Sequence, residues 1–271
     1  MQSLSAVQSC SAIQACSGIQ ACNGITAIPP IAVAAPAFTN TYSVDFDGTD
    51  DYANCGDLTP IEGLTAISIN VWFKANSVSS RGSFVSKYSG NGQRAFTFDF
   101  NADGSIRFLK FASTGSGTNY ISTKTTNTGF DDNAWHMATV TWVPGEAKIY
   151  IDGVEATVSE VVGGTGDGSD IQATTSNFYI GAAELVSTSP DFLLQGKIDE
   201  VAVFGSVLSA AQVTAIYNSG EPADLTSYSP IGWWRMGDND GGTGTTITDQ
   251  GSGGNDATLT NGPTFSTDVP T

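Results

Sequence analysis

Short segments of alternating polar and apolar residues fill the chain from residue 42 onward and constrain its fold more than any other feature. They are YSVDFD, AISINVWFKA, GSFVSKY, RAFTFDFN, GSIRFLKF, WHMATVTW, EAKIYID, SNFYIGA and GKIDEVAVF, with turn residues between them. Alternation with a period of two is typical of β-strands that bury one face. A Pro-Gly turn joins two of the runs in WHMATVTWVPGEAKIYIDG, which predicts a hairpin. The chain is therefore predicted to be all-β and antiparallel.

One helix interrupts this pattern, at residues 209–220. Ser209 and Gln212 fit a capping box, and Gly220 stands where a helix end belongs. The predicted apolar face consists of Val213, Ile216 and Tyr217. Many short strands with one helix favour a two-sheet antiparallel jelly-roll sandwich with one short peripheral helix. The glycine-rich tail from residue 231 is predicted to add one or two strands.

A repeat of one polar, one small and one apolar residue occupies residues 1–28, before a Pro/Ala-rich linker at 29–40 and the sandwich at 41–271. A period of three fits neither an α-helix nor a strand. An extended polyproline-like arm and a β-solenoid-like wrap remain open, beside a disordered leader. Both ordered forms leave apolar side chains that need a partner. These predicted assembly residues are Val7, Cys10, Ile13, Cys16, Ile19, Cys22, Ile25 and Ile28.

Composition and charge exclude several classes of function. The net charge of −17 argues against nucleic-acid binding. No run of about 18 apolar residues is present, so membrane insertion is not expected. The N-terminus lacks the basic and apolar regions of a secretion signal, which indicates synthesis in a cytoplasm. Cys10, Cys16 and Cys22 are six residues apart, about 20 Å in an extended chain, too far for disulfides among them.

Carboxylates gather at the turn in SVDFDGTDDY. Asp47 and Asp51 flank this turn, and calcium takes six to eight oxygen ligands from carboxylates, carbonyls and water. We predict a structural calcium ion there. The alternative is that the Asp side chains cap turn amides without a metal. DNDG, residues 238–241, is a second candidate calcium site.

No constellation for catalysis is found. FTFDFN offers only Asp99, and the neighbours Asp199 and Glu200 in GKIDEV are expected to point to opposite faces of a strand. A glycosidase needs two carboxyl groups flanking one bond. His136, the single histidine, has no accompanying nucleophile. The sequence therefore predicts a protein that is not an enzyme.

Several segments, in this order, resemble the laminin-G-like branch of the concanavalin A-like jelly rolls: SVDFDGTDDY, AISINVWFKA, WHMATVTW, AKIYIDGVEA, FYIGA and GKIDEVAVFGSVLSAAQVTAIYNSG. The resemblance covers about residues 40–220. It implies two curved sheets, binding of sugars or proteins and, in many members, a structural calcium ion. It also implies that the GKIDEV strand lies near Asp47 and Asp51, which makes Asp199 the third predicted calcium ligand. The tail, WWRMGD…GSGGNDATLTNGP, resembles a segment of structural proteins of tailed bacteriophages.

An arm, a stiff linker and a displayed domain together predict a non-enzymatic virion structural protein. It would be a capsid decoration or fibre component, made in the host cytoplasm and located in the virion. Residues 4–31 would hold it to other virion proteins or to itself as a homotrimer, and its jelly roll would bind host-surface glycans or stabilise its neighbours. The alternative is a free carbohydrate-binding lectin or bacterial surface adhesin outside the cell, which the missing secretion signal disfavours.

Overall fold

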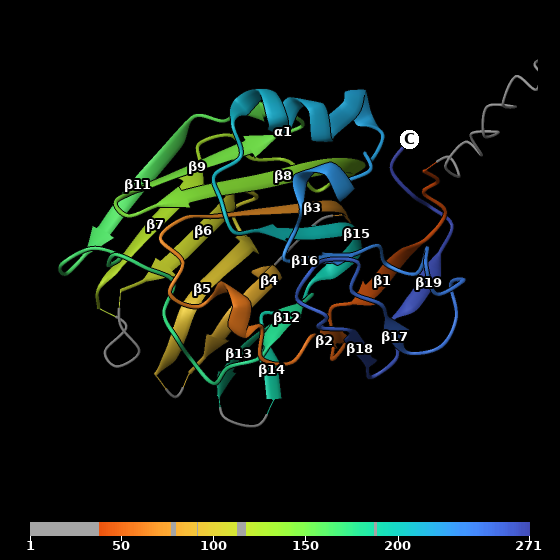
Figure 1. The fold of residues 1–271 in the computed structure, drawn as a ribbon, viewed down its shortest axis with the longest axis horizontal. Coiled ribbons are helices and arrows are strands. Elements are labelled where there is room, and N and C mark those ends of the chain that lie inside the picture. Colours follow the sequence, from red (N-terminus) through yellow and green to blue (C-terminus); the bar gives the residue numbers. More distant parts are fainter. Residues whose placement is uncertain (1–37, 77–79, 91, 113–117, 187–188) are drawn as a thin grey trace, which may run out of the picture. The chain divides into compact units, whose positions relative to one another are not determined.

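Two antiparallel β-sheets pack face to face and form a sandwich (Figure 1). The computed structural model describes residues 38–76, 80–90, 92–112, 118–186 and 189–271. The predicted all-β sandwich with one short helix is confirmed. The repeat, with all eight predicted assembly residues, lies outside the described residues, so the arm stays a prediction.

The first sheet has eight strands. In spatial order they are β10 (Val154–Glu155), β9 (Glu146–Ile151), β8 (Asp132–Val143), β3 (Ile67–Asn76), β15 (Gln195–Phe204), β1 (Ser43–Asp47) and β19 (Thr264–Ser266), with β16 (Gly232–Trp234) also paired to β15. The predicted hairpin is β8 and β9, in which Trp142 pairs with Ala147. Long alternating segments thus form the middle of this sheet.

The second sheet has nine strands. In spatial order they are β11 (Val158–Gly163), β7 (Tyr120–Thr125), β6 (Ile106–Phe111), β5 (Gln93–Phe100), β4 (Gly82–Ser89), β12 (Phe178–Ile180), β2 (Tyr52–Asn54), β18 (Ala257–Thr260) and β17 (Thr246–Ile247). Of these, β2, β7 and β11 are strands that the sequence did not reveal. A separate hairpin consists of β13 (Ala183–Val186) and β14 (Ser189–Asp191). The tail contributes β16 to β19, four short strands rather than the predicted one or two.

The main core lies between the sheets and is rich in aromatic rings. Its largest fully buried side chains include Phe46, Phe73, Phe84, Phe96, Phe98, Phe100, Phe108, Trp142 and Trp234. Strand alternation explains why each sheet supplies one apolar face to this core. Trp233 and Trp234, as neighbours, point to opposite faces, and Trp234 is the one that enters the core.

A smaller core covers the outer face of the eight-stranded sheet under helix α1 (Ala210–Tyr217). The capping box is confirmed: Ser209 Oγ accepts a hydrogen bond from the Gln212 amide, and Gln212 Oε1 accepts one from the Ser209 amide. The α-helix ends at Asn218 in the left-handed conformation, two residues before Gly220, and a 3₁₀ turn, η2 (Asn218–Gly220), follows. Two further 3₁₀ turns are η1 (Thr59–Ile61) and η3 (Thr226–Tyr228).

The buried face of α1 matches the predicted one. Val213 and Ile216 are buried, and Tyr217 stacks on Trp72 at a centroid distance of 5.6 Å. The helix therefore seals one side of the sandwich. Within the described part of the chain, no helix is long and apolar enough to cross a membrane.

Candidate functional site

Two adjoining hollows lie on the outer face of the nine-stranded sheet, over β4 to β7 and β11. Each has a volume of about 460 Å³. One is lined by Tyr88, Arg94, Arg107, Leu109, Phe111, Tyr120, Ser122 and Val161. The other is lined by Asn101, Ala102, Asp103, Arg107, Ser122, Lys124, Ser159 and Val161. Because they share Arg107, Ser122 and Val161, we treat them as one feature, the outer groove.

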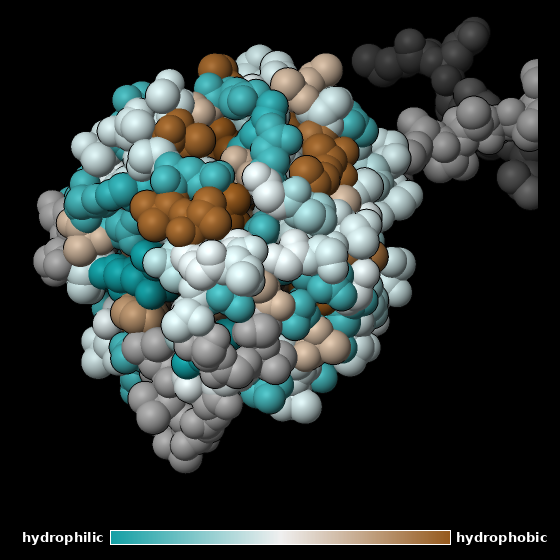
Figure 2. Space-filling view, turned by 90° about the vertical axis from the view of Figure 1, so that its left-hand side faces the viewer, coloured by the Kyte–Doolittle hydropathy of each residue, from teal (hydrophilic) through white to brown (hydrophobic). Residues whose placement is uncertain are grey.

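Strand alternation creates the outer groove. On β6, Ile106 and Phe108 enter the core, so Arg107, Leu109 and Phe111 face outward. Figure 2 views the molecule from the side that carries β11 and shows hydrophobic patches bordered by hydrophilic side chains. Val161 on β11 belongs to the groove and is 59% exposed. The outer groove thus offers apolar surface directly to solvent.

Three aromatic rings form a row in the outer groove. The ring centroids of Tyr88 and Phe111 are 5.5 Å apart, and those of Phe111 and Tyr120 are 6.2 Å apart. The Arg94 guanidinium lies 5.8 Å from the Tyr88 ring centroid. Aromatic faces with polar groups at their edges provide both apolar contact and directional hydrogen bonds. Such a surface suits a ligand that has an apolar face and a polar rim.

A buried carboxylate supports the floor of the outer groove. Asp99 is fully buried, and its Oδ2 accepts hydrogen bonds from Arg107 at 2.8 Å, Arg81 at 2.6 Å and Thr97 at 2.8 Å. Burial lowers the pKa of Arg81, while the adjacent Asp99 opposes that shift. Two guanidinium groups therefore share one carboxylate, and Arg107 is held in a fixed position beneath the groove.

The predicted calcium turn brings three carboxylates together. Oxygens of Asp47, Asp50 and Asp51 lie within 4.8 Å of one another. Hydrogen bonds from the Thr49 and Asp50 amides lower the pKa of Asp47. Burial first, and then the neighbouring carboxylates, raise the pKa of Asp51. The cluster could hold a cation, because each of the three carboxylates offers an oxygen as a ligand.

Asp199 does not join this cluster. In the pairing of β1 with β15, Asp47 lies opposite Gln195, four residues before Asp199, a separation of about 13 Å along a strand. Asp199 is instead fully buried and accepts a hydrogen bond from Asn40 Nδ2 at 2.8 Å. The structure thus brings together two of the three predicted ligands and adds Asp50.

The DNDG segment is occupied by other contacts. Asp238 accepts hydrogen bonds from the Thr41 and Tyr42 amides and pairs with Arg235. Asp240 accepts two hydrogen bonds from Thr248. These carboxylates close loops, and no group of metal-ligating side chains among the described residues includes them.

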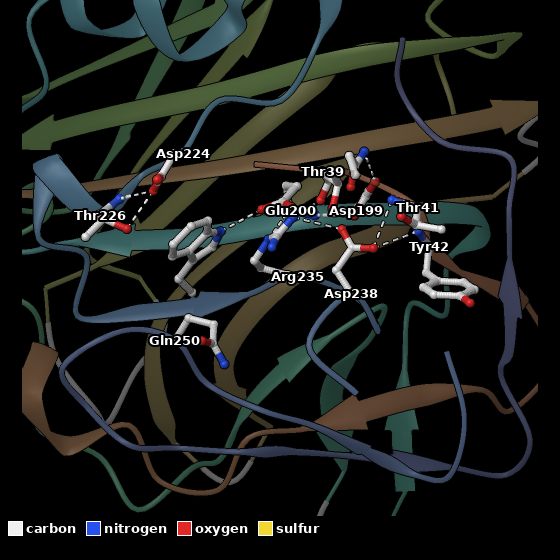
Figure 3. A network of polar contacts seen from close by, with 12 residues as sticks. Thr39, Thr41, Tyr42, Asp199, Glu200, Asp224, Thr226, Arg235, Asp238 and Gln250 are labelled. Atoms are coloured by element: carbon white, nitrogen blue, oxygen red, sulfur yellow. Dashed lines mark hydrogen bonds and ion pairs between the residues drawn. The ribbon is translucent and has the colours of Figure 1, made fainter. Parts of the chain in front are cut away.

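Asp199 and Glu200 belong to a buried polar network (Figure 3). The prediction that they point to opposite faces is wrong, because β15 has a bulge between Asp199 and Ala202 and Glu200 adopts a positive φ of 46°. Asp199 lies opposite Trp72, and Glu200 accepts a hydrogen bond from Trp233 Nε1 at 2.6 Å, so both carboxyl groups lie on the outer face. The bulge thus changes which side Glu200 occupies.

Arg235 is the cation of this network. It donates to Glu200 Oε1 and to Asp238 Oδ2, at 2.9 Å each, and to the Thr39 carbonyl at 2.5 Å. Burial raises the pKa of Glu200 to about 7, although Arg235 opposes the shift. Burial and the neighbouring Glu200 raise the pKa of Asp199 well above its usual range. The network also ties residues 39–42 to the sandwich, through Asn40 on Asp199, the Thr39 carbonyl on Arg235, and the Thr41 and Tyr42 amides on Asp238.

Comparison with known proteins gives one family and several similar folds. A family model described as the concanavalin A-like lectin/glucanases superfamily matches residues 47–214. The structure of a candidate carbohydrate-binding protein of Bacteroides ovatus superposes on this one with a TM-score of 0.62 and 16% sequence identity. The match covers 86% of this chain and 62% of that protein's chain. A heptameric SAP-like pentraxin of Limulus polyphemus has a TM-score of 0.50 and 13% identity, covering 67% of this chain and 84% of its own. No curated protein matches.

Proposed function

This chain belongs to the concanavalin A-like lectin/glucanase superfamily, and on that premise we propose that its sandwich is a non-enzymatic carbohydrate-binding domain. The observation that carries the proposal is the outer groove, in which Tyr88, Phe111 and Tyr120 form an aromatic row beside polar side chains. A sugar ring has an apolar face of C–H groups and a rim of hydroxyl groups, so it matches such a surface. The fold similarity to a candidate carbohydrate-binding protein agrees with this function.

The arrangement of carboxyl groups supports binding rather than hydrolysis. Asp103 is the single carboxylate that lines the outer groove within the described residues, and it pairs with Lys124 at 2.7 Å. Asp199 and Glu200 are adjacent in the chain, but both are buried and belong to β15 of the other sheet, and neither lines the outer groove. Hydrolysis would need two carboxyl groups flanking one glycosidic bond. We therefore keep a non-enzymatic role in the proposal.

Binding by a free lectin or adhesin is favoured over the predicted virion role. Neither the family nor the two similar structures named above is described as a virion component. Anchoring through residues 4–31, to a virion or to two further copies, depends on the repeat, which lies outside the described residues. A displayed glycan-binding domain is compatible with either location.

A single tyrosine substitution tests the proposed site. In calorimetric titrations of the full chain with the best ligand from a glycan array, Tyr120→Ala should weaken binding about tenfold or more, because it removes one ring of the aromatic row. Tyr52→Ala is the matched control, since Tyr52 is a half-buried tyrosine of the same sheet that packs on Tyr179 outside the groove. Equal affinity of Tyr120→Ala and wild type would refute the site.

Calcium binding at the Asp47–Asp51 turn is a second part of the proposal. The donor set fits a hard cation, because it consists of three carboxylates whose oxygens lie within 4.8 Å of one another. Calcium should fix this turn and stabilise the folded chain by about 2.7 kcal/mol at a concentration 100 times its dissociation constant.

Titration with calcium after chelator treatment checks this expectation. Calorimetry should show binding that Asp51→Ala weakens and Asp224→Ala does not, since Asp224 caps Thr226 away from the turn. Absence of both heat and a shift in melting temperature would remove calcium from the proposal.

A further inference from the structure

The outer groove is lined mainly by basic side chains, although the protein as a whole is acidic. The chain has 27 acidic and 10 basic residues. Within its described part, however, Arg94, Arg107 and Lys124 line the groove and Asp103 is the one acidic lining residue. The hollow that carries the aromatic row has both arginines and no acid. A surface that is acidic overall therefore has a basic binding groove.

The positive charge of the groove is not cancelled by its floor. Asp99 supplies one negative charge, which Arg81 and Arg107 share. Asp103 pairs with Lys124 in the second hollow. Counting these groups leaves an excess of positive charge at the end of the groove where Arg94 and Arg107 meet the aromatic row.

The guanidinium group of Arg107 is already oriented for binding an anion in the outer groove. Its Nη2 is fixed by Asp99 Oδ2, and its buried Nε has no hydrogen-bond partner among the described residues. Its side chain is 19% exposed at the groove, so the guanidinium is held in place yet reachable. A guanidinium group that is already oriented loses little entropy when it binds an anion, and its planar fork suits a carboxylate or a sulfate.

We infer, on the basis of the proposed glycan-binding function, that the outer groove selects anionic sugars. A sugar ring packs on the Tyr88, Phe111 and Tyr120 row, and its carboxylate or sulfate group binds Arg94 and Arg107. The net charge of −17 does not prevent this, because at physiological ionic strength charges more than about 8 Å apart are largely screened. Local arginines then decide the sign of the interaction.

Matched pairs of glycans test this selectivity. The probe is an array of uronic-acid oligosaccharides, each as the free acid and as the methyl ester, together with sulfated galactans and their desulfated forms. The full chain should bind at least one anionic member tenfold or more tightly than its neutral partner. Tighter binding of the free acids than of their methyl esters would show that the groove recognises carboxylates. Tighter binding of sulfated than of desulfated galactans would show that it recognises sulfates.

Variants of the full chain locate the effect. Arg94→Gln should remove most of the preference for the anionic partner, and Arg107→Gln should do the same if circular dichroism shows that it folds. Lys148→Gln is the matched control, because Lys148 is a cation of the other sheet whose Nζ lies 3.5 Å from Glu155. Equal affinity for anionic and neutral partners, with binding still lost in Tyr120→Ala, would overturn this inference and leave the proposed function. Absence of glycan binding would overturn both.

Discussion

Replacing Arg235 with Met should lower the free energy of unfolding by about 3–5 kcal/mol at neutral pH. The side chain is 11% exposed and is the cation for Glu200 and Asp238, which are 2% and 4% exposed. Loss of the guanidinium leaves two buried carboxylates without their partner, and an uncompensated buried charge is strongly destabilising. The Phe38 ring, 4.1 Å from the guanidinium, also loses its cation–π contact.

Chemical denaturation of paired variants separates this effect from lost packing. Arg235→Met combined with Glu200→Gln should regain part of the lost stability, because the double variant removes one unpaired charge. Lys148→Met removes an exposed ion pair, and its unfolding free energy should stay within about 1 kcal/mol of wild type. A loss below 1 kcal/mol for Arg235→Met would show that the network contributes little to stability.

The same network predicts that the protein is less stable at pH 8 than at pH 5. Folding raises the pKa of Glu200 from 4.5 to about 7, and raises that of Asp199 well above its usual value. The folded state therefore binds protons more tightly than the unfolded state, so this stabilisation is complete below about pH 4.5 and is lost as pH rises through 7. A shift of one pKa unit corresponds to about 1.4 kcal/mol, so the Glu200 shift corresponds to roughly 3 kcal/mol.

Two other titratable groups, His136 and Asp103, also make the stability of the protein depend on pH. The pKa of His136 is raised by its hydrogen bond to Asp152, so its contribution also falls as pH rises. Hydrogen bonds, that of Lys124 foremost, lower the pKa of Asp103 to about 2. Asp103 therefore contributes stability that is lost only in more acidic solution. The maximum of stability should thus lie near pH 5.

Denaturation midpoints measured from pH 4.5 to pH 8 check this dependence. Asp199→Asn should flatten the slope, because the amide resembles the protonated acid and cannot ionise. Asp224→Asn should leave the slope unchanged, since hydrogen bonds from Thr226 lower the pKa of Asp224 and place its titration in more acidic solution. An unfolding free energy that rises between pH 5 and pH 8 would contradict the assignment.

The strands that could be predicted from sequence are the long ones with one clearly apolar face. The segment AISINVWFKA became β3, and WHMATVTW became the central part of β8, where Val140 and Trp142 enter the main core. Strands β7 and β11 were not predicted, because in YISTKT and VSEVVG the two faces of the strand do not differ clearly in hydrophobicity. Long-range pairing, rather than local pattern, makes them strands.

The candidate sites, like the strands, could be predicted only where the residues involved are close together in the sequence. Asp47 and Asp51 could be predicted as neighbours because one turn brings them together, and Asp50 was within the same segment. The bulge at Glu200 has no local signature, since nothing in GKIDEV marks a left-handed residue. The outer groove was missed because its residues come from five strands and from the turn between β5 and β6. One signal was present: β6 has outward-facing Leu109 and Phe111, so both of its faces are partly apolar.

The position of a bound oligosaccharide is the most direct test of the proposed function. A crystal structure of the full chain with its best array ligand should show a sugar ring on the row of Tyr88, Phe111 and Tyr120, within hydrogen-bonding distance of Arg94 or Arg107. An ordered saccharide elsewhere, for example at the Asp47–Asp51 turn, with no sugar in the outer groove, would contradict the assignment of this groove as the glycan-binding site.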